Sequence, residues 1–186
     1  ETKEERENYL SLLEKFQHDD FLELFRIMDG KPVTIRLLDP PLHEFLPHTE
    51  EDIATLSGHI KKPVELIRNA VKDLTEVNPM LGLRGCRLSV VHPEITEMQV
   101  RAIISAAVVA TEEGYQPLPE IMIPLVVNVR EIRLVSEIID RGIQAVMKEK
   151  SLSIRYKIGT MMETPRACLG ADRLAKDVEF MSFGTN

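Results

Sequence analysis

The sequence has few cysteines, no long hydrophobic run and no cluster of basic residues. Its two cysteines, Cys86 and Cys168, are too few for a disulfide scaffold in 186 residues, and such sparse use is typical of a reducing compartment. The longest apolar stretches, residues 102–110 and 121–127, are far shorter than the ~20 residues that span a bilayer. We therefore expect neither a disulfide framework nor insertion into a membrane.

Basic residues are fewer than acidic residues. The chain has 23 lysines and arginines against 30 aspartates and glutamates, which gives a formal net charge of −7. A mildly acidic chain without a basic patch is a poor candidate for binding nucleic acid. The first residues, ETKEEREN, contain no apolar segment, so no secretory signal is visible and a cytoplasmic location is expected.

The residues that are present are typical of a globular α/β protein. The sequence is 44% apolar and 28% charged, and its length suits about one domain. We expect helices over residues 4–28, 49–59, 63–77, 92–113, 129–148 and 165–178, the last broken at Gly170. We expect strands over residues 32–38, 80–91, 120–127, 156–163 and 178–186. Helices that alternate with short apolar strands predict a parallel sheet.

Five expected strands leave two architectures open. An open, doubly wound sheet of five strands would be complete, whereas a (β/α)8 barrel would lack three strands, since such barrels need about 250 residues. The sequence stops at Asn186, at the end of an expected strand with no helix after it to cover that strand. We therefore expect a piece of a larger domain, which would carry open sheet edges and be prone to aggregate by itself.

Polar residues follow several of the expected strands. They are Arg36, Arg84, Arg87, Asn128, Glu163, Ser182 and Asn186. Ligands of parallel α/β folds bind at the carboxyl ends of strands, so these side chains form a candidate site. Two arginines suit a ligand with a carboxylate and a phosphate, because a guanidinium group binds either one bidentately. One glutamate with neutral oxygen donors suits Mg²⁺.

Each candidate also has a structural interpretation. Arg36 has Asp39 three residues later as an ion-pair partner, and Glu163 could stabilise the start of the helix at Pro165. The two cysteines are expected to be small buried hydrophobic residues. The five histidines show no spacing typical of metal ligands, so zinc is not expected.

A resemblance to a known family rests on five segments, in this order: TIRLLDPPLHEFLPH, NPMLGLRGCRL, EIMIPLV, IGTMMETPRA and FMSFGTN. They resemble the C-terminal phosphoenolpyruvate (PEP)/pyruvate-binding domain of the pyruvate, phosphate dikinase family, over about residues 22–186. Phosphoenolpyruvate synthase and enzyme I of the sugar phosphotransferase system share the framework, but LHEF and RGCR favour the dikinases. The resemblance implies a partial (β/α)8 barrel of about five consecutive β/α units. Residues 1–30 would then be a leading helical segment, and residues 31–186 would hold strands two to six.

The resemblance also implies roles for individual residues. Arg36 and Arg84 would bind the phosphate and carboxylate of the substrate, with Arg87 in support, and Glu163 would bind Mg²⁺. Ser182, Thr185 and Asn186 would contact the substrate. The sequence departs from the usual pattern at Leu83 and Val127, which would change packing around the site. The second metal carboxylate and the cysteine that donates a proton in relatives would lie beyond residue 186, so no catalytic residue is expected here.

The implied function is part of a phosphotransferase that interconverts ATP, pyruvate and phosphate with AMP, PEP and diphosphate through a phosphohistidine. Its partners would be a swivelling phosphohistidine domain of the same protein and a second copy in a homodimer. Relatives in plastids and glycosomes make an organelle the alternative location, if a targeting signal lies outside this stretch. Three other functions stay open: a non-catalytic PEP-binding fragment, a phosphoenolpyruvate synthase-like enzyme, and another metal-assisted barrel enzyme that acts on 2-oxo acids.

Overall fold

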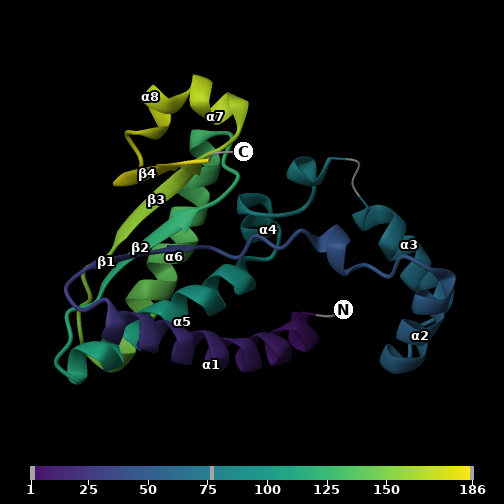
Figure 1. Ribbon diagram of the computed structural model, residues 1–186, viewed down its shortest axis with the longest axis horizontal. Helices are drawn as coiled ribbons and strands as arrows, with labels where there is room; N and C mark the ends of the chain where they lie inside the picture. Colours follow the sequence, from purple (N-terminus) through teal and green to yellow (C-terminus); the bar gives the residue numbers. More distant parts are fainter. Residues whose placement is uncertain (1–2, 76–77, 185–186) are drawn as a thin grey trace. The chain divides into compact units, whose positions relative to one another are not determined.

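The computed structural model describes residues 3–75 and 78–184 (Figure 1). The chain divides into two compact units, and we describe each by itself. The first joins Glu1–Asp39 with Gly85–Asn186, and the second is Pro40–Arg84. The second unit is therefore inserted in the sequence of the first.

The first unit is built on a parallel sheet. Its strands are β1 (Pro32–Arg36), β2 (Leu118–Ile123), β3 (Lys157–Met162) and β4 (Phe180–Phe183). All neighbouring pairs are parallel, and the order is β1-β2-β3-β4. Along the described residues this order has no reversal of the kind that defines a doubly wound sheet, which favours the barrel-type arrangement. The α/β class with a parallel sheet is confirmed.

Helices cover one face of this sheet. The helices of the first unit are α1 (Lys3–Ile27), α4 (Cys86–Val91), α5 (Pro93–Glu112), α6 (Val129–Lys150), α7 (Pro165–Leu169) and α8 (Ala171–Leu174). Helix α1 packs on α5, and α5 packs on α6 (Figure 1). None of the helices in the described ranges is long and apolar enough to cross a membrane.

The core lies between the sheet and the helices. Val33 and Ile35 of β1 and Ile121 and Ile123 of β2 are buried there, together with Ile103 of α5 and other apolar side chains. Each fully buried side chain of this size contributes roughly 1.5–3 kcal/mol relative to an exposed one. Because side chains alternate along a strand, Thr34 and the other residues between these point to the opposite face. That face is free to carry polar groups.

The second unit is helical. It contains the 3-10 helices η1 (Leu42–Phe45) and η2 (Pro79–Leu81) and the α-helices α2 (Glu50–Ile60) and α3 (Val64–Leu74). Helix α2 begins with a capping box, in which the Thr49 hydroxyl accepts from the Asp52 N–H and the Asp52 carboxylate accepts from the Thr49 N–H. Arg68 of α3 forms an ion pair with Glu50 of α2, which joins the two helices.

The strand expected over residues 80–91 is wrong. This stretch holds η2, a turn and α4, and the sheet has four strands within the described residues. The turn is at Gly85, whose φ is +57°, and α4 buries Cys86, Leu88 and Ser89. A short apolar run interrupted by glycine fits a buried strand or a buried helix equally well. The expected close approach of backbone was right, since a Cβ on Gly85 would lie 2.8 Å from the Leu125 Cβ.

Candidate functional site

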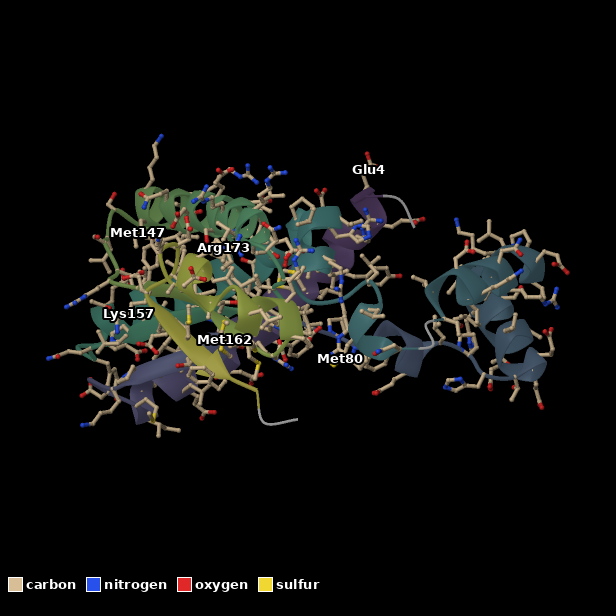
Figure 2. All side chains as sticks on the ribbon, turned by 90° about the horizontal axis from the view of Figure 1, so that it is seen from above. Glu4, Met80, Met147, Lys157, Met162 and Arg173 are labelled. Carbon is tan, nitrogen blue, oxygen red and sulfur yellow. The ribbon has the colours of Figure 1, made fainter. Side chains whose placement is uncertain are left out.

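Three predicted site residues share the uncovered face of the sheet. Arg36 is in register with Met122, Met122 with Gly159, and Gly159 with Phe180. Ser182 is in register with Met161, two residues after Gly159, and Glu163 follows two residues later. An even spacing keeps side chains on the same face of a strand. Arg36, Ser182 and Glu163 therefore lie on one face, toward its carboxyl edge. Glu163 directly follows Met162, the last residue of β3, which is labelled in Figure 2.

Arg36 forms an ion pair and remains accessible. Its Nη1 atom lies 3.5 Å from Asp39 Oδ2, and the Asp39 side chain is only 1% exposed while that of Arg36 is 46% exposed. The expected structural pairing is therefore present. A buried carboxylate on one side of the guanidinium orients this group and leaves its other donors to a ligand.

Gln99 of α5 fixes the backbone at Arg36, a role that the sequence analysis missed. Its Oε1 atom accepts from the Leu38 N–H at 2.7 Å, and its Nε2 atom donates to the Arg36 carbonyl at 3.3 Å. Gln99 is 3% exposed, within a helix whose other buried residues are mostly apolar. A glutamine in such a run was the available signal, because buried amides normally have hydrogen-bond partners.

Glu163 is tied to the loop that follows β2. Its Oε1 atom accepts a hydrogen bond of 2.8 Å from the Leu125 N–H. The start of α7 is capped by Thr164 instead, whose hydroxyl accepts from the Ala167 N–H and donates to the Val126 carbonyl. Glu163 is therefore positioned by the loop and is not the cap of the helix.

Asn128 has a structural role. Its side chain accepts from the Arg130 N–H as the N-cap of α6, and the Glu131 carboxylate accepts from the Val127 and Asn128 N–H groups. This capping box explains the polar residue after β2 without a ligand.

The other candidates do not lie on the described strands of this sheet. Arg84 is the last residue of the second unit, and its N–H donates to the Gly82 carbonyl. The expectation that Arg84 follows the core of a strand is wrong, because the described residues form no strand there. Arg87 lies in α4. Thr185 and Asn186 lie outside the described residues.

The two cysteines differ. Cys86 is fully buried, and burial is the main cause that raises the pKa of its thiol to about 12. Cys168 is exposed, so the expectation that both are buried is wrong for it. Helix α7 has only five residues, of which Ala167 is buried, and the adjacent Cys168 side chain faces solvent.

The described residues do not form a complete metal site by themselves. No group of three or more His, Cys, Asp or Glu side chains that could hold a metal ion occurs among them. Glu163 fits Mg²⁺ as a single carboxylate ligand, because its Oε1 is held in place by Leu125 and Mg²⁺ commonly takes one or two carboxylates plus oxygens from substrate and water.

Comparison with known proteins gives one family for the whole chain. Residues 2–186 match the family model "PEP-utilising enzyme, PEP-binding domain". The chain is also similar to curated proteins described as pyruvate, phosphate dikinase. The one from Giardia intestinalis is 49% identical over 97% of this chain, and the one from Clostridium symbiosum is 47% identical over 98%.

A plant relative is equally similar. The pyruvate, phosphate dikinase of Flaveria trinervia, described as chloroplastic, is 50% identical over 100% of this chain. The match covers 20%, 21% and 20% of the three relatives. The chain therefore spans about a fifth of the length of the proteins that it matches.

Proposed function

The chain belongs to the PEP-utilising enzyme family, through its PEP-binding domain, and we propose that it binds PEP and pyruvate as part of a pyruvate, phosphate dikinase. In that enzyme it would host the transfer of a phosphoryl group between a phosphohistidine and pyruvate. The overall reaction interconverts ATP, pyruvate and phosphate with AMP, PEP and diphosphate.

One observation carries this proposal. Arg36, Glu163 and Ser182 come from segments up to 146 residues apart in the sequence, yet they share one face and one edge of the parallel sheet. A cation, a carboxylate and a hydroxyl at the carboxyl ends of strands suit a small dianionic ligand that binds with a metal ion. The similarity to dikinases extends over the whole chain, this edge included.

Each residue has a role in this proposal. Arg36 and Arg84 bind the phosphate and carboxylate of PEP, and Ser182, Thr185 and Asn186 contact the ligand. Asp39 orients the Arg36 guanidinium through their ion pair. Glu163 is the residue that would hold Mg²⁺, whose positive charge would stabilise the enolate oxygen and the phosphoryl group in transfer.

Phosphoryl transfer would proceed through the enolate of pyruvate. Pyruvate loses one methyl proton to form its enolate, and the enolate oxygen attacks the phosphorus of the phosphohistidine. The new O–P bond forms as the N–P bond breaks, and the histidine leaves with the electron pair. The arginines would bind the negative charge that the substrate already carries. They would also stabilise the negative charge that develops on the oxygens of the transferred phosphoryl group. No described residue of this chain is assigned as the base.

The remainder of the protein supplies the other parts. We propose that residues 31–186 are strands two to six of a (β/α)8 barrel. The β1–β4 sheet would be part of that barrel. A phosphohistidine domain of the same polypeptide, an ATP-binding region and a second copy of the protein would be its partners. The location would be the cytoplasm, or an organelle such as a plastid, as for the chloroplastic relatives, or a glycosome.

Two substitutions test the proposal in the whole dikinase. Arg36→Ala and Glu163→Ala should each lower kcat/KM for PEP by at least about a hundredfold, the size expected for a lost charge-stabilising group. Circular dichroism should show that the fold survives. Arg155→Ala is the matched control, because Arg155 is exposed and precedes β3, at the opposite edge of the sheet. Normal turnover in either site variant would reject the assignment.

A further inference from the structure

The loop after β2 holds Glu163 through a residue in an unfavourable conformation. Leu125 has a φ of +55°, in the left-handed region that side chains with a Cβ seldom adopt. In this conformation its N–H donates to Glu163 Oε1 at 2.8 Å. Leu125 is 2% exposed, so the hydrogen bond is shielded from water. Such a conformation persists only where neighbouring groups hold the peptides on both sides.

Cys86 is the group that holds those two peptides. Its N–H donates to the Pro124 carbonyl at 3.1 Å, and its Sγ donates to the Leu125 carbonyl at 3.2 Å. Gly85 makes this approach possible, because any Cβ there would lie 2.8 Å from the Leu125 Cβ. Cys86 therefore donates hydrogen bonds to two successive carbonyl groups of the loop.

The thiol of Cys86 has the protonation state that this role needs. Only the protonated thiol can donate to a carbonyl, and burial raises the pKa of Cys86 to about 12. At neutral pH the thiol is therefore a donor and not a nucleophile.

Other hydrogen bonds of the loop do not replace those of Cys86. Thr164 donates to the Val126 carbonyl, and Glu131 accepts from the Val127 N–H. Both hydrogen bonds fix the same peptide, Val126–Val127, which comes after Leu125. Cys86 holds the two peptides that flank the Leu125 α-carbon, Pro124–Leu125 and Leu125–Val126.

We infer that Cys86 is a positioning residue for Glu163: it locks the Pro124 and Leu125 carbonyls, so that the Leu125 N–H stays directed at the Glu163 carboxylate. It touches neither ligand nor metal and acts only through Leu125. The consequence for metal binding rests on the proposed function, whereas the link between Cys86 and Leu125 does not. Groups of this kind typically change metal affinity by about 10–100-fold when removed.

The direct test is NMR of the full chain labelled with ¹⁵N at leucine. Cys86→Ala should move the Leu125 amide proton signal upfield, in the same direction as Glu163→Gln, because both weaken its hydrogen bond. Cys86→Ser keeps a donor and should restore part of the shift. Cys168→Ala is the matched control, since Cys168 is exposed, and should leave the signal in place.

A second measurement follows the metal. Binding of Mn²⁺, used as a paramagnetic probe and detected by electron paramagnetic resonance, should weaken on the order of tenfold in Cys86→Ala. It should weaken further in Glu163→Gln. If Glu163→Gln binds Mn²⁺ normally, the proposed metal role of Glu163 fails, and the NMR result still decides the positioning role.

A purely structural role for Cys86 gives a different result. Cys86→Ala would then lower the melting temperature and leave the Leu125 signal unmoved. That result would overturn the inference. If Cys86→Ala does not fold, Cys86→Thr and Cys86→Val provide the same comparison, with and without a donor, at nearly the same side-chain size.

Discussion

The aromatic ring of Phe180 occupies the space where a side chain on Gly159 would begin. The two residues are partners in the β3–β4 register, and a Cβ on Gly159 would lie 2.5 Å from the Phe180 ring. Such a distance is far inside van der Waals contact. The ring thus lies against β3 at Gly159, on the face that carries Arg36, and the absence of a side chain at Gly159 is what makes room for it.

Gly159→Ala should therefore destabilise the first unit. Overpacking of this kind typically costs about 1–3 kcal/mol, because the ring must leave its rotamer or the strands must separate. The free energy of unfolding in urea measures the effect. Gly58→Ala is the control, since nothing lies within 4 Å of a Cβ there and Gly58 lies inside α2. That variant should be neutral or slightly stabilised. An equal loss in both would show that packing against Phe180 is not the cause.

Gln99→Met should leave two partly buried backbone groups without their side-chain partner. The Leu38 N–H and the Arg36 carbonyl would each lose a hydrogen bond, at a cost of about 1–3 kcal/mol in the free energy of unfolding. Affinity for PEP should fall as well, because the peptide that carries Arg36 would lose its anchor. Calorimetry measures both. Gln116→Met, at an exposed position before β2, should change neither quantity, and an unchanged affinity in Gln99→Met would remove the positioning role.

Asn128→Ala should lower stability and leave ligand affinity unchanged. The Asn128 N-cap contributes about 1 kcal/mol to the free energy of unfolding. Its loss also leaves the Glu131 backbone N–H without the side-chain acceptor of the capping box. Thermal unfolding together with PEP titration separates the two effects. The same substitution inside a helix, Asn69→Ala at an exposed position of α3, should be neutral or stabilising. A loss of PEP affinity in Asn128→Ala would return this residue to the binding site.

Tyr156 should make the protein lose stability in alkali. Burial, and then the hydrogen bond from its hydroxyl to Asp140, raise its pKa from 10 to about 12. The group is protonated in both states below pH 10, so its contribution is fully present there. Between pH 10 and about 12 the unfolded chain releases the proton first, and this stability is lost. The free energy of unfolding of Tyr156→Phe should fall less steeply across this window than that of the wild type. Tyr9→Phe, at an exposed position, should follow the wild type, and identical slopes in all three proteins would contradict the raised pKa.

The fold was largely predictable because its signals are local. Periodicity located α1, α5 and α6, and short β-branched runs located all four strands that the structure describes. The exception, residues 80–91, is decided by a tertiary contact. Gly85 turns the chain so that α4 packs against the loop at Leu125, and no feature within the run itself shows this.

The candidate site was predictable where side-chain alternation decides it. Arg36, Glu163 and Ser182 share a face because of the register of the strands that carry them or precede them. The roles of Gln99 and Cys86 were not predictable, because both residues act on backbone groups far away in the sequence. The capping role of Asn128 was missed for a related reason: a polar residue after a strand can belong to a ligand site or begin the next helix, and Asn128 is the N-cap of α6.

The insertion of residues 40–84 into the first unit has a consequence for folding during synthesis. Strand β1 pairs with β2, and its first residue, Pro32, has its register partner 86 positions later, at Leu118. At about 5–20 residues per second, a ribosome needs roughly 4–17 s to make that stretch. Helix α1 waits almost as long for its own partner, α5. Strand β1 therefore emerges with its backbone groups unpaired, and α1 emerges before the helix that it packs on, whereas α2 and α3 can pack together as soon as they leave the ribosome. Synthesis speed and chaperone binding in that interval should decide the yield of folded protein.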